Sequence, residues 1–449
     1  MKKNIDRREF FKMAGGGVAA SAAVACAGEK GAKAVGVTSE KPLGEMVYRE
    51  GPSGDKVSLL GYGCMRWPMI DDGNGGKKID QDAVNELVDY AMAHGVNYYD
   101  TAPVYLQGQS QAASALALSR YPRDSYYLAT KLSTQRLTGS KMYEASLEMY
   151  RNSFKQMNVD YIDYYLLHCI TSKETYISRF IDSKVIDFLL KEREAGRIRH
   201  LGYSVHCDME CFDYILADHD KYHWDFVQIQ MNYVDWVQDA EYMYNELAKR
   251  NIPVVIMEPL LGGQLSTLND MASGKLRALR PSESVASWAF RFCGTMPGVL
   301  TVLSGMTYME HLQDNLRTYC PLEPLEDSDF KLLDEIAREF IEFPLVPCTA
   351  CNYCMPCPYG VDIPGGFLHY NKCLNEGMVK SDEGDPAYRK ARRAFLVGLD
   401  RNLDLLRQAD HCIGCKKCMP KCPQRIRIPQ QMRRIDKFVE NLRLHSDII

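Results

Sequence analysis

Several features that define other classes of protein are missing from this chain. No stretch reaches the roughly 20 uninterrupted apolar residues that a membrane-spanning helix needs. The formal net charge is only −4, which argues against nucleic acid as a partner because no strong positive field is available. No Gly-x-Gly-x-x-Gly segment opens a dinucleotide-binding fold, and there is no internal repeat. The composition, 46% hydrophobic and 25% charged, is ordinary for a globular protein.

Cysteine, in contrast, is abundant, and half of the 16 cysteines lie in two dense runs near the C-terminus. Thiolates that repeat every third residue along a short loop can hold three corners of one iron–sulfur cluster. A fourth cysteine, directly before a proline, usually reaches the other cluster of a two-cluster protein. The runs therefore predict two [4Fe–4S] clusters. The predicted ligands are Cys348, Cys351, Cys354 and Cys357 in the first run, and Cys412, Cys415, Cys418 and Cys422 in the second.

Two other interpretations of the cysteine runs are weaker. Structural zinc prefers two separated Cys-x2-Cys pairs, and cysteines three apart on one turn make poor disulfide partners. One departure from the ferredoxin pattern concerns Cys357, which follows a gap of two residues where the bacterial pattern has three. Its ligand role is therefore less fixed by the spacing than that of Cys422. The cysteines of residues 60–373 outside the runs show no pairing pattern and are expected to be buried thiols.

The first residues look like a targeting segment rather than part of the fold. Residues 6–12, Asp-Arg-Arg-Glu-Phe-Phe-Lys, resemble the twin-arginine export motif of bacteria, with Asp6 where Ser or Thr is usual. A disordered basic tail is the alternative. Ala23–Cys26 also looks like a lipoprotein cleavage box, and lipidation of Cys26 would tether the protein to a membrane. The segment predicts export by the twin-arginine route, either to the periplasm or as a membrane-anchored lipoprotein.

Apolar runs that alternate with amphipathic stretches predict a (β/α)8 barrel. Helix candidates such as 81–94, 141–157, 240–249 and 283–293 lie between the strand candidates. A doubly wound open sheet would give a similar alternation but lacks its glycine motif here. The strand candidates are Val57–Gly63, Val96–Asp100, Tyr126–Lys131, Ile162–His168, Ile198–Ser204, Phe226–Met231, Val254–Glu258 and Val299–Leu303.

A chain of 449 residues exceeds one typical domain. Helices at 327–343 and 386–409 flank or separate the cysteine runs, which favours an α-helical ferredoxin-like two-cluster domain after the barrel. The predicted organisation is a signal segment at 1–27, a linker at 28–44, a barrel at 45–325, a connecting helix at 326–345 and a ferredoxin-type 4Fe–4S domain at 346–449.

Four polar residues lie at or just past the ends of three consecutive predicted strands, where a barrel of this kind carries its active site. They are Asp100, Tyr105, Lys131 and His168. A tyrosine hydroxyl, with a pKa near ~10, would be a better proton donor if a neighbouring ammonium lowered that pKa. We expect Lys131 to do so, Asp100 to hold Lys131, and His168 to orient a carbonyl oxygen that Tyr105 protonates.

These residues and several motifs resemble the aldo/keto reductase family over about residues 44–320. The four polar residues fall where the Asp-Tyr-Lys-His tetrad of the family falls. Further resemblances are Gly95–Ala102, Asp160–Asp163, Gly196–Arg199 and Gly202–Ser204. The segments Gly63–Arg66, Met257–Leu260 and Cys354–Pro364 are similar to a bacterial branch of the family with a C-terminal ferredoxin-type domain.

The resemblance implies a nicotinamide cofactor, NAD(P), bound near the tetrad. The positions implied to hold it are Ser204, Gln228, Glu258, Leu260, Asp314 and Asn315. The chain departs from the family at Met257, where an aromatic residue would stack on the nicotinamide, and at Val205, where an Asn is usual. Gly305 and His311 replace the basic residues that bind the 2′-phosphate of NADP. Because each charge-assisted contact is worth roughly 1.5–3 kcal/mol, a strong NADP preference is not supported.

Three functions are compatible with these features. The first is an oxidoreductase that interconverts carbonyl and alcohol by hydride transfer and exchanges electrons through its clusters with a protein partner. In the second, the barrel receives electrons only through the clusters, without free nicotinamide. In the third, the barrel is a non-catalytic scaffold for an electron relay, although a scaffold has no need of the tetrad. The carbonyl or alcohol substrate cannot be predicted from the sequence, because the substrate pockets of such barrels are formed by variable loops.

Overall fold

The computed structural model describes residues 43–134, 141–379 and 384–444. The predicted signal at 1–27, with Cys26, and nearly all of the linker at 28–44 lie outside the described residues. Within the described ranges, none of the helices combines the length and the apolar character that a bilayer crossing demands.

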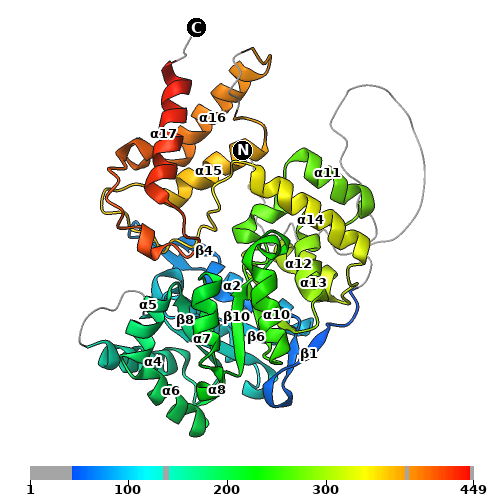
Figure 1. The fold of residues 1–449 in the computed structure, drawn as a ribbon, viewed down its shortest axis with the longest axis vertical. Helices are drawn as coiled ribbons and strands as arrows, with labels where there is room; N and C mark the ends of the chain where they lie inside the picture. Colours follow the sequence, from blue (N-terminus) through cyan, green and yellow to red (C-terminus); the bar gives the residue numbers. More distant parts are fainter. Residues whose placement is uncertain (1–42, 135–140, 380–383, 445–449) are drawn as a thin grey trace, which may run out of the picture. The chain divides into compact units, whose positions relative to one another are not determined.

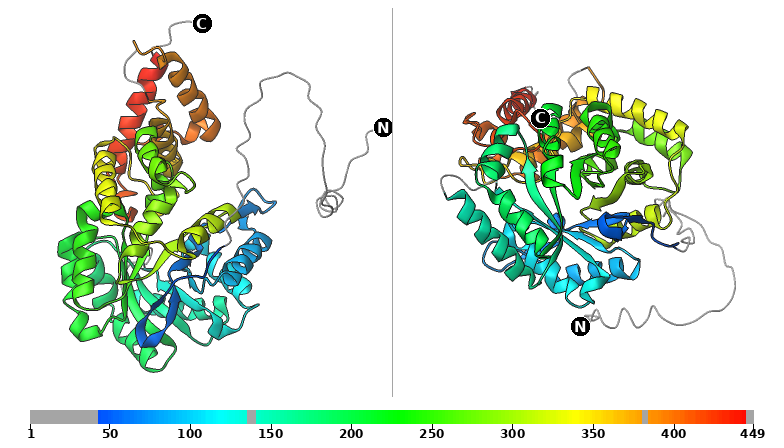
Figure 2. Two further views of the ribbon diagram at one scale, coloured as in Figure 1. Left: turned by 90° about the vertical axis from the view of Figure 1, so that its right-hand side faces the viewer. Right: turned by 60° about the horizontal axis from the view of Figure 1, so that its bottom comes forward.

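Eight parallel strands close into a barrel, as the sequence predicts. In the right-hand view of Figure 2 the strands gather at the centre and the helices surround them. The order around the barrel is β3-β6-β7-β8-β9-β10-β11-β12, with β12 pairing back to β3. The strands are β3 (Leu60–Gly63), β6 (Tyr98–Asp100), β7 (Tyr127–Leu132), β8 (Ile162–Ile170), β9 (Ile198–Val205), β10 (Phe226–Gln230), β11 (Val254–Met257) and β12 (Val299–Ser304).

Burial explains why these segments form strands. Every residue of β8 is buried, as expected for a parallel strand that is covered on both faces. Aromatic and branched side chains from different strands fill the inside of the barrel, so that it is a packed core and not a pore. Its largest members include Tyr98, Tyr164 and Phe226.

Helices cover the outside of the barrel, and several of them begin at side-chain caps. Asp80, Asp208 and Ser284 each accept a hydrogen bond from a first-turn backbone amide, which satisfies a donor that the helix leaves unpaired. Figure 1 shows most of these helices. The longer ones are α2 (Gln81–Ala93), α3 (Ser110–Leu118), α4 (Met142–Met157), α6 (Val185–Glu194), α7 (Met209–Leu216), α10 (Glu241–Lys249), α11 (Asp270–Leu279), α12 (Val285–Thr295), α13 (Met309–Tyr319) and α14 (Asp327–Glu342).

Two short hairpins accompany the barrel. β1 (Tyr48–Glu50) pairs with β2 (Lys56–Ser58), and β4 (Met69–Asp71) pairs with β5 (Lys77–Ile79), both antiparallel. The first predicted strand, 57–63, is thereby divided between β2 and β3. The apolar character of residues 57–63 predicted a single strand. In the structure the first residues of this segment pair with β1, outside the barrel.

The C-terminal region has its own helical core. α15 (Ile363–Asn375), α16 (Tyr388–Asn402) and α17 (Ile428–Leu444) pack around Phe367, Phe395 and Met432. They are coloured orange to red in Figure 1. The predicted helix at 386–409 is shorter in the structure, because Leu403 has an extended backbone and ends α16. The cysteine runs lie in the loops before α15 and before α17.

Candidate active site

The structure brings the four predicted catalytic residues together at the carboxyl ends of three adjacent strands. Asp100 ends β6, Lys131 lies near the end of β7, and His168 lies near the end of β8. Tyr105 begins the short helical turn Tyr105–Gly108 that follows β6. Its ring and that of His168 meet edge to face, with centroids 5.8 Å apart.

Lys131 and Asp100 form a buried ion pair at the base of this group. Lys131 Nζ donates to Asp100 Oδ1 and, at 2.9 Å, to the carbonyl oxygen of Thr101. The exposed fractions of the two side chains are 0% and 3%. Burial raises the pKa of Asp100 and lowers that of Lys131, and the attraction between the two charges opposes both shifts.

The expected effect of Lys131 on Tyr105 is not found. Burial raises the pKa of Tyr105 well above its ordinary value, with smaller contributions in the same direction from Tyr353 and Asp100. Lys131 Nζ lies over the Tyr105 ring, 4.9 Å from its centroid, and it hydrogen-bonds elsewhere. The physical reason for the error is that sequence spacing shows a neighbouring cation but does not show how completely the phenol is desolvated.

His168 is held in the neutral form. Its pKa is lowered well below the ordinary value, first by burial and then by the charge of Lys131. Its Nδ1 lies 2.5 Å from Ser133 Oγ, and its Nε2 lies 3.4 Å from the hydroxyl of Tyr353. When Ser133 donates to Nδ1, Nε2 carries the ring proton and lies on the side of the ring near Tyr353.

A cavity of about 540 Å³ opens in front of these residues. Asp100, Tyr105 and His168 line it, whereas Lys131 lies behind them. Five of the six residues predicted to bind the cofactor also line it, namely Gln228, Glu258, Leu260, Asp314 and Asn315. The sixth, Ser204, is buried in β9, where its hydroxyl accepts a hydrogen bond from the Cys169 amide at 2.9 Å.

Gln228 provides a test of whether a polar ligand fits this cavity. Its Nε2 lies 3.4 Å from the sulfur of Met257. Its Oε1 is buried and has no hydrogen-bond partner among the described residues. A buried amide oxygen without a partner is costly, and a ligand amide that reached it would remove that cost. The carboxamide of a nicotinamide is a group of this kind.

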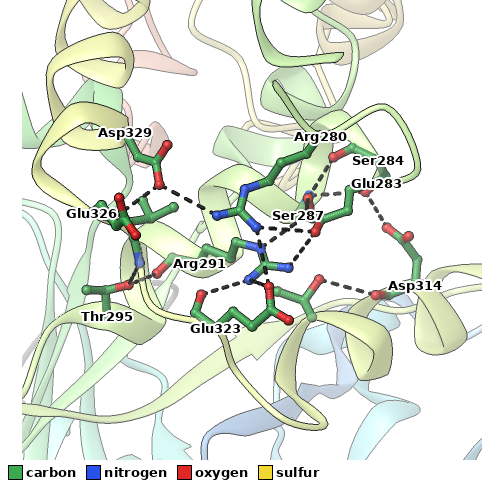
Figure 3. A network of polar contacts seen from close by, with 12 residues as sticks. Arg280, Glu283, Ser284, Ser287, Arg291, Thr295, Asp314, Glu323, Glu326 and Asp329 are labelled. Carbon is green, nitrogen blue, oxygen red and sulfur yellow. Dashed lines mark hydrogen bonds and ion pairs between the residues drawn. The ribbon is translucent and has the colours of Figure 1, made fainter. Parts of the chain in front are cut away.

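Asp314 is oriented by the polar network in Figure 3. Its carboxylate accepts a hydrogen bond of 2.6 Å from Ser284 Oγ, which joins α13 to the start of α12. Arg291, 4% exposed, binds Glu283 with Nε and Nη2 at 3.1 and 2.8 Å. This bidentate pair fixes the same segment.

Glu258 occupies a sharp turn after β11. Its backbone φ is +56°, and its Oε2 accepts a hydrogen bond of 2.8 Å from the Gly262 amide. Burial raises its pKa, although the nearby Arg66 opposes this shift. In this position the carboxyl group shapes the 258–262 turn in the cavity wall.

The eight predicted cluster ligands line two further cavities. Cys348, Cys351, Cys354 and Cys422 line the first, which we call the proximal set because Cys351 also lines the large cavity. Cys357, Cys412, Cys415 and Cys418, the distal set, line the second together with Cys354. Each run thus sends its fourth cysteine to the other set, as in two-cluster ferredoxins.

The donor chemistry of these sets fits iron–sulfur clusters. Four thiols line the proximal cavity, and five line the distal one because Cys354 contributes to both. Thiolates are the ligands that such clusters use. Among the residues that the structure describes, no three His, Cys, Asp or Glu side chains are placed to hold a single metal ion. The described cysteines outside the two runs are all buried.

Hydrogen bonds join the cysteine loops to the barrel. Arg66 donates to the Thr349 carbonyl at 2.7 Å, and Gln264 donates to that of Cys348 at 3.2 Å. Gln230 and Gln424 exchange hydrogen bonds of 3.2 and 2.8 Å. The described residues from 43 onward belong to one compact unit.

Tyr353 belongs to the site but was not predicted from the sequence. It lies between two cysteines of the first run, 185 positions after His168, and it lines the large cavity together with Cys351 and Pro423. The only local signal is an aromatic residue inside a cysteine loop. Such a signal does not indicate which distant surface the loop covers.

Comparison with known proteins defines the class. Residues 59–338 match the aldo/keto reductase family, and residues 347–427 match the 4Fe-4S dicluster domain. The first match covers more than half of the chain, so the chain belongs to the aldo/keto reductase family. It is an oxidoreductase of that type with an iron–sulfur domain at its C-terminal side.

Individual relatives are distant. L-galactose dehydrogenase of Arabidopsis thaliana is 23% identical over 304 residues, which are 64% of this chain and 91% of that protein. Probable aldo-keto reductase 1 of Glycine max is 27% identical over 161 residues, 34% of this chain and 43% of the relative. Several curated relatives are thus matched over less than half of their length.

Solved structures support the fold. The holo form of an aldo-keto reductase from Bacillus halodurans is 23% identical, with a TM-score of 0.52, and 65% of this chain covers 96% of it. An aldo/keto reductase from Klebsiella pneumoniae, solved in complex with NADP and acetate, is 21% identical with a TM-score of 0.50, over 66% of this chain and 96% of the other.

Proposed function

We propose that this protein interconverts carbonyl and alcohol groups with NAD(P), using Tyr105 as the proton donor, and exchanges electrons with a protein partner through two [4Fe–4S] clusters. One observation supports both halves of the proposal. A single cavity is lined by Tyr105 and His168, by most of the predicted cofactor positions, and by Cys351 of the proximal set.

The residues present would perform the acid–base part of the reaction. When bound, NAD(P) supplies or accepts a hydride, and the clusters pass single electrons. His168 donates from Nε2 to the carbonyl oxygen and orients it, while the Tyr105 hydroxyl donates to the same oxygen. Tyr105 gives up its proton as negative charge develops on that oxygen. The Lys131 ammonium beneath the ring then stabilises the phenolate, and Asp100 holds the ammonium in place.

The high pKa of Tyr105 is compatible with this role. Burial keeps the phenol protonated in the resting site, so the Tyr105 hydroxyl carries the proton that it donates before the reaction begins. The proton is transferred only when hydride addition creates a strongly basic alkoxide oxygen. Lys131 therefore assists in the transition state, where the phenolate forms, and not by acidifying the resting phenol.

The proposal is tested with protein purified without oxygen, whose iron and sulfide are first quantified. NADH and NADPH are then titrated while bleaching of the cluster absorbance is followed, and carbonyl turnover is measured separately. Tyr105→Phe should lower kcat for carbonyl reduction by about 10²- to 10⁴-fold and leave the iron content unchanged. Tyr143→Phe, an exposed tyrosine on α4, is the matched control. Unchanged turnover in Tyr105→Phe would refute the catalytic role.

A second candidate function has its own support. Cys351 and Pro423 lie in the wall of the catalytic cavity, so electrons could reach it through the clusters alone. Gly305 and His311 also line this cavity. Neither gives the 2′-phosphate of NADP the charge-assisted hydrogen bonds that an Arg or Lys would give. If the N-terminal segment directs export, nicotinamide is scarce where the protein works. Failure of both NADH and NADPH to bind, with turnover driven by a one-electron donor, would favour this function.

A further inference from the structure

Tyr353 places a third hydrogen-bonding group at the site where the carbonyl would react. Its hydroxyl lies 3.4 Å from His168 Nε2, and the two rings meet edge to face with centroids 6.2 Å apart. Tyr353 is partly accessible, and it lines the same cavity as Tyr105 and His168. The 3.4 Å contact is longer than a well-formed hydrogen bond, so the hydroxyl retains the capacity to donate to a ligand.

The site offers one more hydrogen-bond donor than a carbonyl oxygen can accept. In the proposed reaction Tyr105 and His168 both donate to the carbonyl oxygen. A carbonyl oxygen has two lone pairs, and these two donors fill them. A third donor within reach of the same oxygen needs a further acceptor. That acceptor must lie close to the reacting carbonyl, because Tyr353 and His168 are close to each other.

We propose that Tyr353 is a substrate-binding residue, and that it selects carbonyl compounds with a second oxygen on the adjacent carbon, such as α-hydroxy ketones and aldehydes. The proposal rests on the function proposed above, since it uses the roles given there to Tyr105 and His168. The cysteine domain thus completes the substrate pocket of the barrel and helps to set its specificity.

The matched probes are hydroxyacetone and butanone, which have the same number of heavy atoms and differ by a hydroxyl in place of a methyl group. The dissociation constant of each is measured calorimetrically on the cluster-loaded protein, so that the readout does not depend on turnover. Wild-type protein should bind hydroxyacetone about five- to tenfold more tightly than butanone, the factor expected for one hydrogen bond. The ratio of kcat/KM for the two probes should follow.

Tyr353→Phe keeps the ring and removes the hydroxyl. It should abolish the preference for hydroxyacetone, change the affinity for butanone little, and leave iron and sulfide content unchanged. Tyr359→Phe is the matched control, because Tyr359 lies five residues after Cys354, is 45% exposed and lies outside the large cavity. It should retain the wild-type preference.

Two results overturn the inference: wild-type protein that binds the two probes equally or binds neither, and Tyr353→Phe that retains the preference for hydroxyacetone. Failure of the proposed function has a different signature. In that case neither wild-type protein nor Tyr105→Phe turns over a carbonyl with NADH or NADPH, while the difference in affinity and its loss in Tyr353→Phe persist.

Discussion

The buried pair of Lys131 and Asp100 allows a prediction in which two single variants are worse than the double variant. Both side chains are almost completely removed from solvent. Each charge loses its hydration on folding, and only the partner compensates for that loss. Lys131→Met leaves the buried carboxylate of Asp100 without its ion-pair partner. Asp100→Leu does the same to the buried ammonium of Lys131. The double variant leaves neither charge.

The expected magnitudes follow from this asymmetry. Removal of one partner of a buried pair costs about 3–5 kcal/mol, and about 2–4 °C of Tm is lost per kcal/mol in a domain of this size class. Each single variant should therefore lower the Tm by roughly 6–20 °C. The double variant should recover most of this loss, because well-packed apolar replacements of buried pairs are often neutral or stabilising. All three variants should lose carbonyl turnover.

The assay is thermal unfolding of cluster-loaded protein, with midpoints compared at one scan rate. Lys249→Met is the matched control, because Lys249 is 67% exposed and pairs with Glu246 on the surface of α10. Exposed pairs contribute about 0–1 kcal/mol, so the control should shift the Tm little. The reasoning would be refuted by a Lys131→Met variant as stable as the control. A double variant that loses the sum of the two single effects would refute it equally.

Three further predictions concern other parts of the molecule. Cys351→Ser and Cys415→Ser should each remove about half of the iron and sulfide, because they belong to different cysteine sets; loss of all iron from Cys415→Ser would contradict two independent sites. Gly262→Ala should weaken the contact between barrel and cysteine domain, since its φ is +70° and a Cβ would lie 2.3 Å from Thr349 Cα; faster limited proteolysis near residue 345 is the readout. Burial raises the pKa of Asp235 to about 7, so its contribution to stability is complete at low pH and is lost as the pH rises from about 4 through 7. Asp235→Asn should flatten that loss, measured as Tm at pH 5 and pH 8.

Much of the barrel could be predicted because buried parallel strands leave a strong signal. The Ile162–His168 prediction differs from β8 only in its last two residues, since a strand covered on both faces is a continuous apolar run. The tetrad followed from the same signal, because polar residues at strand ends are conspicuous after such runs. The exact end of α16 could not be predicted, because the turn at Leu403 depends on its packing in the helical core.

The pKa of Tyr105 and the cavity shared by the barrel and the cysteine domain could not be predicted from the sequence, for a different reason. The pKa of Tyr105 depends on burial by several elements together, and residue spacing does not report burial. Cys351 and Tyr353 reach the cavity through a loop that is far from the barrel strands in the sequence. Such contacts are decided by how one domain covers another, which no local pattern encodes.

Two glycines after β11 lie where the barrel packs closely against the cysteine domain. Gly262 and Gly263 follow Leu261 in a tight turn with positive φ, which in isolation reads as an ordinary loop. At Gly262, however, a side chain would occupy the position of the Thr349 backbone. The absence of a side chain at Gly262 thus leaves room for the cysteine loop, and that loop brings Tyr353 to the wall of the large cavity. Without the cysteine domain, the cavity that Tyr105 and His168 line would lose the part of its wall made by Cys351, Tyr353 and Pro423. Under the function proposed above, the two matched regions therefore work as one catalytic unit rather than as an enzyme with an attached electron carrier.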